Sequence, residues 1–290
     1  MKLLMISGDR SILQGKRGAF WYTLHELRKH FDRIDIITPH VAQITPLPVD
    51  GNGAKPEGGE VHFHPCPRGL WYQPKWIRSR GRALVEEHRH DVMTVHEYPP
   101  FYNGCGAVPL HRETGIPFAL EIHHIVGIPV PASFAERIGA WMSRWVLPPY
   151  AKSAAAVRVV NPAIGDLLYQ WGIPADKIKL VPSFYLDRAL LSRDVRPPLS
   201  YDVSFCGRLV LNKQLPTLIE AVADMPEVRL LVIGEGPERK RCEELAKKLG
   251  MQERITFLGW LSSAEAVIGA METARIFVMN SSSEGGPRTA

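Results

Sequence analysis

Two hydrophobic patterns alternate along the first 181 residues, short continuous apolar runs and apolar residues at every third or fourth position. A continuous apolar run at Leu3–Ile6 is typical of a strand that is buried on both faces of a parallel sheet. After a loop at 8–18, apolar residues recur every three or four positions over 20–31, which predicts one buried face of a helix. The same two patterns predict further strands at 34–37, 61–64, 92–96, 118–123, 156–160 and 178–181, with helices at 77–87, 108–113, 134–147 and 163–171.

A break in this pattern divides the chain. Residues 192–200 have no periodicity and contain two prolines, so we expect an interdomain linker there. Beyond it the pattern resumes, with strands expected at 202–206, 228–233, 254–258 and 275–279 and helices at 214–224, 237–249 and 263–273. The sequence therefore predicts an α/β fold of two Rossmann-like, doubly wound parallel-sheet domains, at 1–191 and 201–290, that face a cleft.

The composition is that of an ordinary globular protein, with 45% hydrophobic and 22% charged residues among 290. The first apolar run is too short for a secretory leader, and no stretch approaches the roughly 20 apolar residues of a membrane-spanning helix. The four cysteines have no metal-ligand spacing, so we expect reduced thiols, a cytoplasmic location and no metal site. The net charge of +5 comes from residues 1–190, because residues 191–290 hold 13 charges of each sign.

Four segments of the second half lie where predicted strands end, which is where parallel sheets bind ligands. The first is FCGRL at 205–209, with Lys213 soon after it. The others are VIGEGP at 232–237, ITFLG at 255–259 and SSSEGG at 281–286. The glycine pair of the second segment is not a dinucleotide fingerprint, because Arg239 stands where G-x-G-x-x-G requires its third glycine.

In this order and spacing, the four segments resemble the retaining GT-B glycosyltransferases of family four (the group 1 type), which include sucrose synthases and bacterial mannosyltransferases. The first half is similar to the same family more weakly, through PFALEIH at 117–123 and the pair Gly15 and Gly18. It departs from the family at 183–187, where SFYLD replaces N-G-V-D. The resemblance implies a GT-B fold whose second domain binds a nucleotide sugar and whose first domain binds the acceptor.

The resemblance also implies roles for individual residues. Arg208 and Lys213 would stabilise the diphosphate that leaves with the nucleotide, and His123 would lie beside the sugar. The implied catalytic residues are His123, Arg208, Lys213 and Glu284. The implied donor-binding residues are Gly207, Arg208, Lys213, Gly234, Gly236, Glu284, Gly285 and Gly286. Candidates for the acceptor side are Asp9, Gly15, Lys16 and Gly18. The alternative for each charged residue is a solvated surface position, and for His123 a structural histidine.

The expected reaction moves a hexose from a nucleoside-diphosphate sugar to an acceptor hydroxyl, with retention of configuration and without a metal cofactor. The acceptor is a sugar, a glycan or a lipid-linked molecule. Two rivals stay open, a nucleotide-sugar epimerase of the same fold and a non-catalytic nucleotide-binding protein. The second carboxylate of the family's E-x7-E motif would fall two residues beyond Ala290. We therefore expect a C-terminally truncated chain with an incomplete second domain and little or no activity.

Two basic and aromatic segments stand apart from these motifs. Residues 68–82 hold five Arg and Lys, three aromatic residues and no acid, and helix 134–147 carries Trp141 and Trp145 one turn apart, with Arg137 and Arg144. One interpretation is peripheral contact with an anionic membrane at its inner surface. The other is that the tryptophans lie in the core with the arginines at its rim. Nucleic acid is not an expected partner, because no recognised binding module accompanies these segments.

Overall fold

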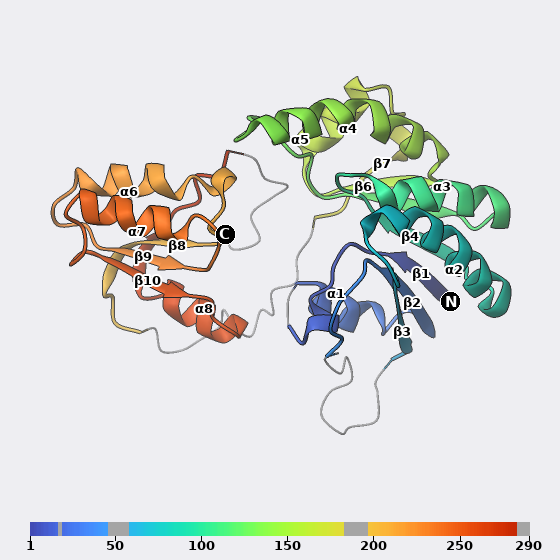
Figure 1. The fold of residues 1–290 in the computed structure, drawn as a ribbon, viewed down its shortest axis with the longest axis horizontal. Coiled ribbons are helices and arrows are strands. Elements are labelled where there is room, and N and C mark those ends of the chain that lie inside the picture. The colour runs from blue at the N-terminus through green and yellow to red at the C-terminus, as the bar shows by residue number, and fades with distance from the viewer. Residues whose placement is uncertain (17–18, 46–57, 183–196, 283–290) are drawn as a thin grey trace. The chain divides into compact units, whose positions relative to one another are not determined.

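The structure, a computed structural model, describes residues 1–16, 19–45, 58–182 and 197–282 (Figure 1). Among these residues, 1–126 and 138–182 form one compact unit, and 127–137 with 197–282 form another. The predicted linker at 192–200 is described only from residue 197 onward, and residues 197–200 belong to no helix or strand. The exact domain bounds, 1–191 and 201–290, stay a prediction.

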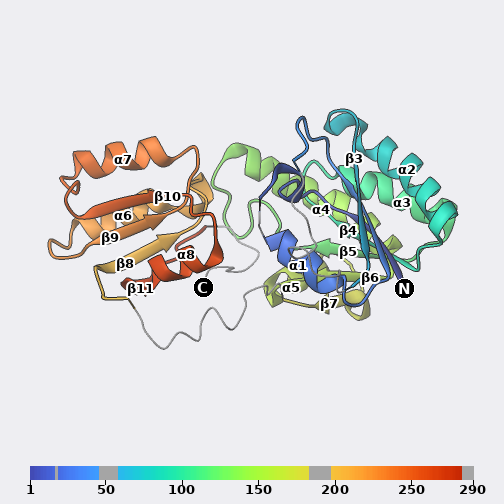
Figure 2. The same cartoon turned by 90° about the horizontal axis from the view of Figure 1, so that it is seen from below.

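The first unit contains a seven-stranded parallel sheet in the order β3-β2-β1-β4-β5-β6-β7 (Figures 1 and 2). The chain builds outward from β1 to β3 and then returns to the other side of β1, so the loops after β1 and β4 diverge at a switch point. Each strand lies within one residue of its predicted position. The strands are β1 (Lys2–Ile6), β2 (Arg33–Thr38), β3 (Glu60–Pro65), β4 (Val92–His96), β5 (Phe118–Ile122), β6 (Ala156–Val159) and β7 (Ile178–Leu180).

Helices cover both faces of this sheet. Helix α1 packs on the face of β1 and β2 that carries Leu3, Met5 and Ile36, while α2 and α3 pack side by side. None of the described helices combines the length and the hydrophobicity that crossing a membrane requires. The helices of this part of the chain are α1 (Ala19–Leu27), α2 (Gln73–His88), α3 (Tyr102–Thr114), α4 (Phe134–Ser153) and α5 (Pro162–Gln170), with the short 3-10 helices η1 (Ile12–Gln14), η2 (Leu70–Tyr72) and η3 (Ala175–Lys177).

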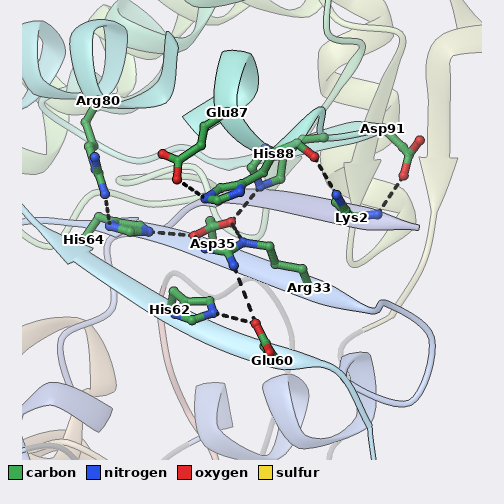
Figure 3. Close-up of polar contacts among 11 residues, drawn as sticks. Lys2, Arg33, Asp35, Glu60, His62, His64, Arg80, Glu87, His88 and Asp91 are labelled. Atoms are coloured by element: carbon green, nitrogen blue, oxygen red, sulfur yellow. Dashed lines mark hydrogen bonds and ion pairs between the residues drawn. The ribbon is translucent and has the colours of Figure 1, made fainter. Parts of the chain in front are cut away.

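A buried carboxylate, Asp35 on β2, lies at the centre of a polar network in the first unit (Figure 3). It accepts hydrogen bonds from His64 Nε2 at 2.7 Å, His90 Nε2 at 2.8 Å and Arg33 Nε at 2.6 Å. Arg80 Nη2 donates to the other ring nitrogen of His64 at 3.2 Å, which fixes that ring as a donor to Asp35. Burial alone would raise the pKa of Asp35, but its three donors hold that pKa well below the usual range. The network joins β2, β3 and the turn before β4.

The second unit repeats this architecture on a smaller scale. Its four parallel strands have the order β10-β9-β8-β11, so the chain again builds outward and then returns to the other side of its first strand. Its core packs Phe205 of β8 and Val232 of β9 against Ile219 of α6. The elements are β8 (Tyr201–Cys206), η5 (Leu211–Lys213), α6 (Leu215–Ala223), β9 (Leu230–Ile233), α7 (Arg239–Lys248), β10 (Ile255–Gly259), α8 (Ala264–Met271) and β11 (Ala274–Phe277).

Candidate functional site

The switch point of the second sheet lies where β8 ends. Gly207 follows β8 directly, and its N–H donates to the carbonyl oxygen of Ile233 in β9 at 3.0 Å. Arg208 comes next and is exposed. The turn at η5 then brings Lys213 back to the same place, because its Cε lies 3.9 Å from the position of a Cβ on Gly207. Both predicted cations therefore border one glycine at the carboxyl end of an inner strand of the sheet.

The turn after β9 packs directly on this segment. A Cβ on Gly234 would lie 1.9 Å from the carbonyl oxygen of Gly207, and a Cβ on Gly236 would lie 2.3 Å from that of Leu209. The N–H of Leu209 donates to the carbonyl oxygen of Glu235 at 2.9 Å. The two predicted glycines thus permit a close approach of two backbone segments. Their role in ligand binding stays a prediction.

The segment after β11 reaches the same loop from the other side of β8. The Asn280 side chain donates to the carbonyl oxygen of Gln214 at 2.8 Å, and the N–H of Ser282 donates to that of Asn212 at 2.8 Å. These bonds hold the chain, up to Ser282, beside the turn that carries Lys213. The residues expected next in the site, Glu284, Gly285 and Gly286, lie outside the described residues.

Cys206, the last residue of β8, carries a titratable thiol beside these two cations. Burial raises the pKa of Cys206 to about 11 against the opposing effect of Lys213, so the thiol is neutral at neutral pH. In the turn after β9, Arg239 pairs with Glu235 and lies 2.8 Å from Glu243. Within the described ranges, no group of three or more His, Cys, Asp or Glu side chains is arranged to hold a metal ion.

The switch point of the first sheet lies between the ends of β1 and β4. Gly8 follows β1, and the ring of Tyr98, which follows β4, fills the space beside it: a Cβ on Gly8 would lie 2.1 Å from that ring. Asp9, an acceptor-side candidate, accepts a hydrogen bond from the N–H of Ser11 at 2.7 Å. Asp9 therefore stabilises the turn that leads from β1 into η1.

The other acceptor-side candidates lie further along this loop. Gly15 ends η1 with φ +73°, and its N–H donates to the carbonyl oxygen of Ile12 at 3.2 Å. Lys16 is exposed. Gly18 lies outside the part of the chain that the structure describes. Asp9, Gly15 and Lys16 thus follow β1 within one loop, and their contact with an acceptor stays a prediction.

A row of polar side chains crosses three strands of the first sheet near their carboxyl ends. His96 on β4 is in register with Glu121 on β5, which is in register with Arg158 on β6. His123 stands two residues after Glu121 and one residue beyond the end of β5, so the two side chains share a side of the sheet. The ring of His96 lies 4.6 Å from that of His123 between centroids. Of this row, sequence analysis identified only His123.

His123 is oriented by its two charged neighbours. Its Nε2 lies 3.2 Å from Glu121 Oε2 and 3.4 Å from Arg158 Nη1. Burial alone would raise the pKa of Glu121, but the hydrogen bond from His123 and the charge of Arg158 lower it. Arg158 Nη1 also lies 3.3 Å from Glu121 Oε2 and donates there, so the same carboxylate accepts the proton of His123 Nε2, which we assign to that nitrogen. His123 Nδ1 is buried and has no hydrogen-bond partner among the described residues.

Two family profiles match this chain. The profile described as "Glycosyl transferase 4-like domain" matches residues 19–183, more than half of the chain, and "Glycosyl transferases group 1" matches residues 195–290. The chain belongs to the glycosyl transferase 4-like family. The two matches follow the division between the sheets, because the first spans β2 to β7 and the second spans β8 to β11.

Relatives of this glycosyl transferase 4-like chain are themselves named as transferases. The lipopolysaccharide core biosynthesis glycosyltransferase LpsE of Rhizobium meliloti (strain 1021) is 39% identical over 99 residues, which are 34% of this chain and 27% of the relative. Sulfoquinovosyl transferase SQD2 of Arabidopsis thaliana is 26% identical over 288 residues, 94% of this chain and 53% of the relative. The chain spans between a quarter and about half of the length of the curated relatives it matches.

The fold is also that of known GT-B structures. The crystal structure of Anabaena Alr3699/HepE in complex with UDP and glucose has a TM-score of 0.67 and 17% identity, covering 97% of this chain and 74% of that one. At this identity the likeness concerns the fold alone. Together with the two parallel sheets, it confirms the predicted α/β class of two Rossmann-like domains of GT-B type.

In this glycosyl transferase 4-like chain, the expectation that the aromatic segments form core is wrong for three tryptophans. Trp71, Trp141 and Trp145 are all exposed. The buried face of α4 consists of small residues and one leucine instead. These residues are Gly139, Ser143, Leu147 and Ala151.

Proposed function

We propose that the protein is a retaining hexosyltransferase, which moves a hexose from a nucleoside-diphosphate sugar to an acceptor hydroxyl. The observation that carries this proposal is the pair of cations, Arg208 and Lys213, that borders Gly207 at the switch point of the second sheet. Open parallel sheets bind their ligands at such points. Membership of the glycosyl transferase 4-like family, and the UDP and glucose in HepE, support the choice of a nucleotide sugar.

Charge development in the reaction explains why two fixed cations would be useful here. The bond between the anomeric carbon and a diphosphate oxygen breaks, and the diphosphate leaves with the bonding electrons. Negative charge grows on its oxygens in the transition state, so Arg208 and Lys213 stabilise that state more than the bound donor. The neutral thiol of Cys206 adds no opposing charge at neutral pH.

Retention follows if the acceptor attacks on the face from which the diphosphate leaves. The acceptor oxygen forms the new bond to the anomeric carbon, and its proton passes to the departing phosphate oxygen. This scheme asks the protein for positioning and electrostatics more than for a dedicated base. His123 is proposed to contact the hexose through Nδ1, its ring nitrogen without a described partner.

The remaining roles come from the family resemblance. Glu284 is proposed to accept hydrogen bonds from the hexose hydroxyls, and the amides of Gly285 and Gly286 to face the diphosphate. Gly234 and Gly236 are proposed to lie near the nucleotide. The acceptor side is proposed to include Asp9, Gly15, Lys16 and Gly18, and the acceptor is a sugar, a glycan or a lipid-linked molecule. The proposal involves no metal ion and places the reaction in the cytoplasm.

Calorimetric titration with UDP and GDP tests the donor site directly. Arg208→Ala and Lys213→Ala are each expected to weaken binding by ~1.5–3 kcal/mol, the value of a lost hydrogen bond to a charged group. Lys247→Ala is the matched control, because this exposed lysine lies at the far end of α7 from the turn after β9. If both cation variants bind the nucleotides as tightly as the parent chain, the donor site is wrongly assigned.

A turnover assay separates hexose transfer from epimerisation, which the fold alone does not distinguish. UDP- and GDP-hexoses are incubated with and without a panel of acceptors, and the products are examined by NMR. Transfer with the donor's anomeric configuration supports the proposal, whereas inversion contradicts retention. An isomerised nucleotide sugar without acceptor indicates an epimerase, and nucleotide binding without either reaction is the result expected both of a binding protein and of a chain with an incomplete donor site.

A further inference from the structure

One face of α4 exposes a stripe of large apolar side chains. Their separations of four, three and four residues place them in line along nearly three turns of the helix. Scattered single apolar residues are normal on a protein surface, but a contiguous stripe marks an interaction site. The stripe consists of Phe134 (73% exposed), Ile138 (43%), Trp141 (65%) and Trp145 (66%).

The helix that presents this stripe is anchored by its other face. Gly139, Ser143, Leu147 and Ala151 are buried at every fourth position. The Ser143 hydroxyl donates to the carbonyl oxygen of Gly139 at 2.8 Å, so its polar group is satisfied within the helix. The outward position of the tryptophans therefore has another cause than the lack of a buried face on the helix. They face outward although one is present.

The border of the stripe carries positive charge. Arg137 and Arg144 are exposed and, at the helical angle of about 100° per residue, lie next to each other along one side of the stripe. The single acid of α4, Glu136, lies on the opposite side of the helix, where its carboxylate accepts the N–H of Ala132 at 2.8 Å. The exposed stripe thus meets cations and no carboxylate from its own helix.

A second aromatic and basic segment precedes α2. Trp71 is 69% exposed, and the guanidinium carbon of Arg68 lies 4.9 Å from the ring centroid of Tyr72. The Nζ of Lys75 lies 5.8 Å from the same centroid. This segment repeats the combination of an exposed tryptophan with neighbouring cations that α4 presents.

Both segments lie next to the first turn of α3. Leu70, beside Trp71, lines a small pocket together with Tyr102 and Asn103. The ring of Tyr150 on α4 packs on the following residue, Gly104, where a Cβ would lie 2.3 Å from it. Trp71 and the tryptophans of α4 therefore belong to the same unit, and Tyr150 contacts α3 from the face of α4 opposite the stripe.

We propose that the α4 stripe docks the protein on an anionic lipid surface. Tryptophan rings favour the level of lipid headgroups, aliphatic and phenyl groups enter the acyl boundary, and arginines pair with lipid phosphates. A nucleic-acid site of similar size would replace apolar side chains with several phosphate-binding cations, whereas this stripe has two arginines at its border. The inference rests on the exposed face and is independent of the proposed transfer reaction.

Vesicle sedimentation tests this inference with the 290-residue chain. Binding to phosphatidylcholine vesicles that contain about one-third phosphatidylglycerol is expected, with binding to pure phosphatidylcholine at least about tenfold weaker because each basic residue adds to the attraction. Trp141→Ala with Trp145→Ala is expected to weaken binding by about tenfold or more, since two large apolar contacts are lost. Arg137→Gln with Arg144→Gln is expected to weaken it by about tenfold and to reduce its salt dependence.

Matched controls come from exposed residues elsewhere. Trp260→Ala removes an equally exposed tryptophan, 65%, from the second unit, and Lys247→Gln with Lys248→Gln removes two exposed cations. Both controls are expected to bind vesicles like the parent chain. Brominated lipids are expected to quench tryptophan fluorescence in the parent, and Trp141→Phe with Trp145→Phe is expected to keep the binding while losing most of that quenching.

Four results would overturn the proposal. The first is a failure to bind anionic vesicles at low salt, and the second is equal binding of the parent and the Trp141→Ala, Trp145→Ala variant. The third is displacement of the protein from vesicles by short duplex DNA at equal phosphate concentration, which would assign the face to nucleic acid. The fourth is a dimer in sedimentation equilibrium that the same tryptophan substitutions convert to monomer, which would assign the face to a second copy of the chain.

Discussion

Gly234 packs backbone to backbone against Gly207 and leaves no room for a side chain. A Cβ on residue 234 would lie 1.9 Å from the carbonyl oxygen of Gly207, and its φ of +131° is one that residues other than glycine rarely adopt. Gly234→Ala is therefore expected to lower the free energy of unfolding by about 2 kcal/mol or more, measured by urea denaturation. Because Arg208 follows Gly207, the same variant is expected to bind UDP or GDP more weakly.

The control for this prediction is Gly250→Ala in the same unit. Gly250 also has a positive φ, +70°, but no atom lies within 4 Å of a Cβ at that position. It therefore isolates backbone strain, which costs about 1–2 kcal/mol, from steric conflict. Equal losses of stability in the two variants would show that the close approach to Gly207 has no energetic weight.

Glu121 gives a second prediction, about the orientation of His123. Glu121→Gln removes the anion that accepts the Nε2 proton of His123 and pairs with Arg158 at 3.3 Å. We expect a loss of about 1–3 kcal/mol in the free energy of unfolding at pH 7, as for other buried charge-assisted contacts. Ring nitrogen shifts in ¹⁵N NMR should show the Nε2–H form of His123 in the parent and a mixture of tautomers in the variant.

The pH dependence of that loss provides its control. The pKa of Glu121 is lowered in the folded protein, so its contribution is fully present above the unfolded pKa and is lost as pH falls through the folded pKa. The stability difference between parent and Glu121→Gln should therefore shrink below about pH 4. A difference that is constant from pH 7 to pH 3 would mean that the charge of Glu121 is not what stabilises the row.

Asp35 gives a third prediction, for stability alone. Asp35→Asn removes the charge on which His64, His90 and Arg33 converge, and it leaves Arg33 with a buried partner that is neutral. The expected loss is about 3–5 kcal/mol in urea denaturation at pH 7, as for one member of a buried ionic network. Asp32→Asn is the control, because exposed Asp32 pairs with the N-terminal amine at 2.6 Å, and it should leave the free energy of unfolding nearly unchanged.

Most of the fold is predictable from the sequence because each buried strand is a short apolar run that ends at a glycine, proline or polar residue. Three helices, α2, α3 and α4, are longer than their periodicity indicates, and α3 begins at Tyr102 instead of residue 108. Helix α2 begins at Gln73, since Pro74 fits the first turn of a helix, where its missing N–H is not needed. Helix α4 continues to Ser153 through Pro148 and Pro149. Burial of Leu147 and Ala151 on either side of the prolines outweighs their unfavourable helix propensity.

Some residues of the candidate site are likewise predictable from the sequence, and others are not. Arg208 and Lys213 are identifiable because they lie within a few residues of one strand end, so local sequence brings them together. Glu121 and Arg158 are not, because their contact depends on the register between β5 and β6, which are separated by a long crossover. A charged residue inside each apolar strand was the available signal. The pattern of α4 likewise has two candidate faces, and only packing decides that Trp141 is on the exposed one.

The last prediction concerns Glu97, a buried carboxyl group that follows β4. Burial raises its pKa from the usual 4.5 to about 8, although the N–H groups of Tyr98 and Gly104 donate to its oxygens. Between these two pH values the unfolded chain releases the proton and the folded chain keeps it. The contribution of Glu97 to stability is therefore greatest below about pH 4.5 and is lost as pH rises through about 8, by an amount on the order of 5 kcal/mol.

Glu97→Gln is a permanently neutral replacement whose single carbonyl oxygen can accept from only one of the Tyr98 and Gly104 N–H groups, which donate to different oxygens of Glu97. Its stability relative to the parent is expected to rise by several kcal/mol between pH 4.5 and pH 8, in urea denaturation across this range. Glu86→Gln, at an exposed residue 3.8 Å from Arg82, is the control and should show no such trend. A Glu97→Gln variant that is less stable than the parent by the same amount at every pH would show that Glu97 is already ionised in the folded protein.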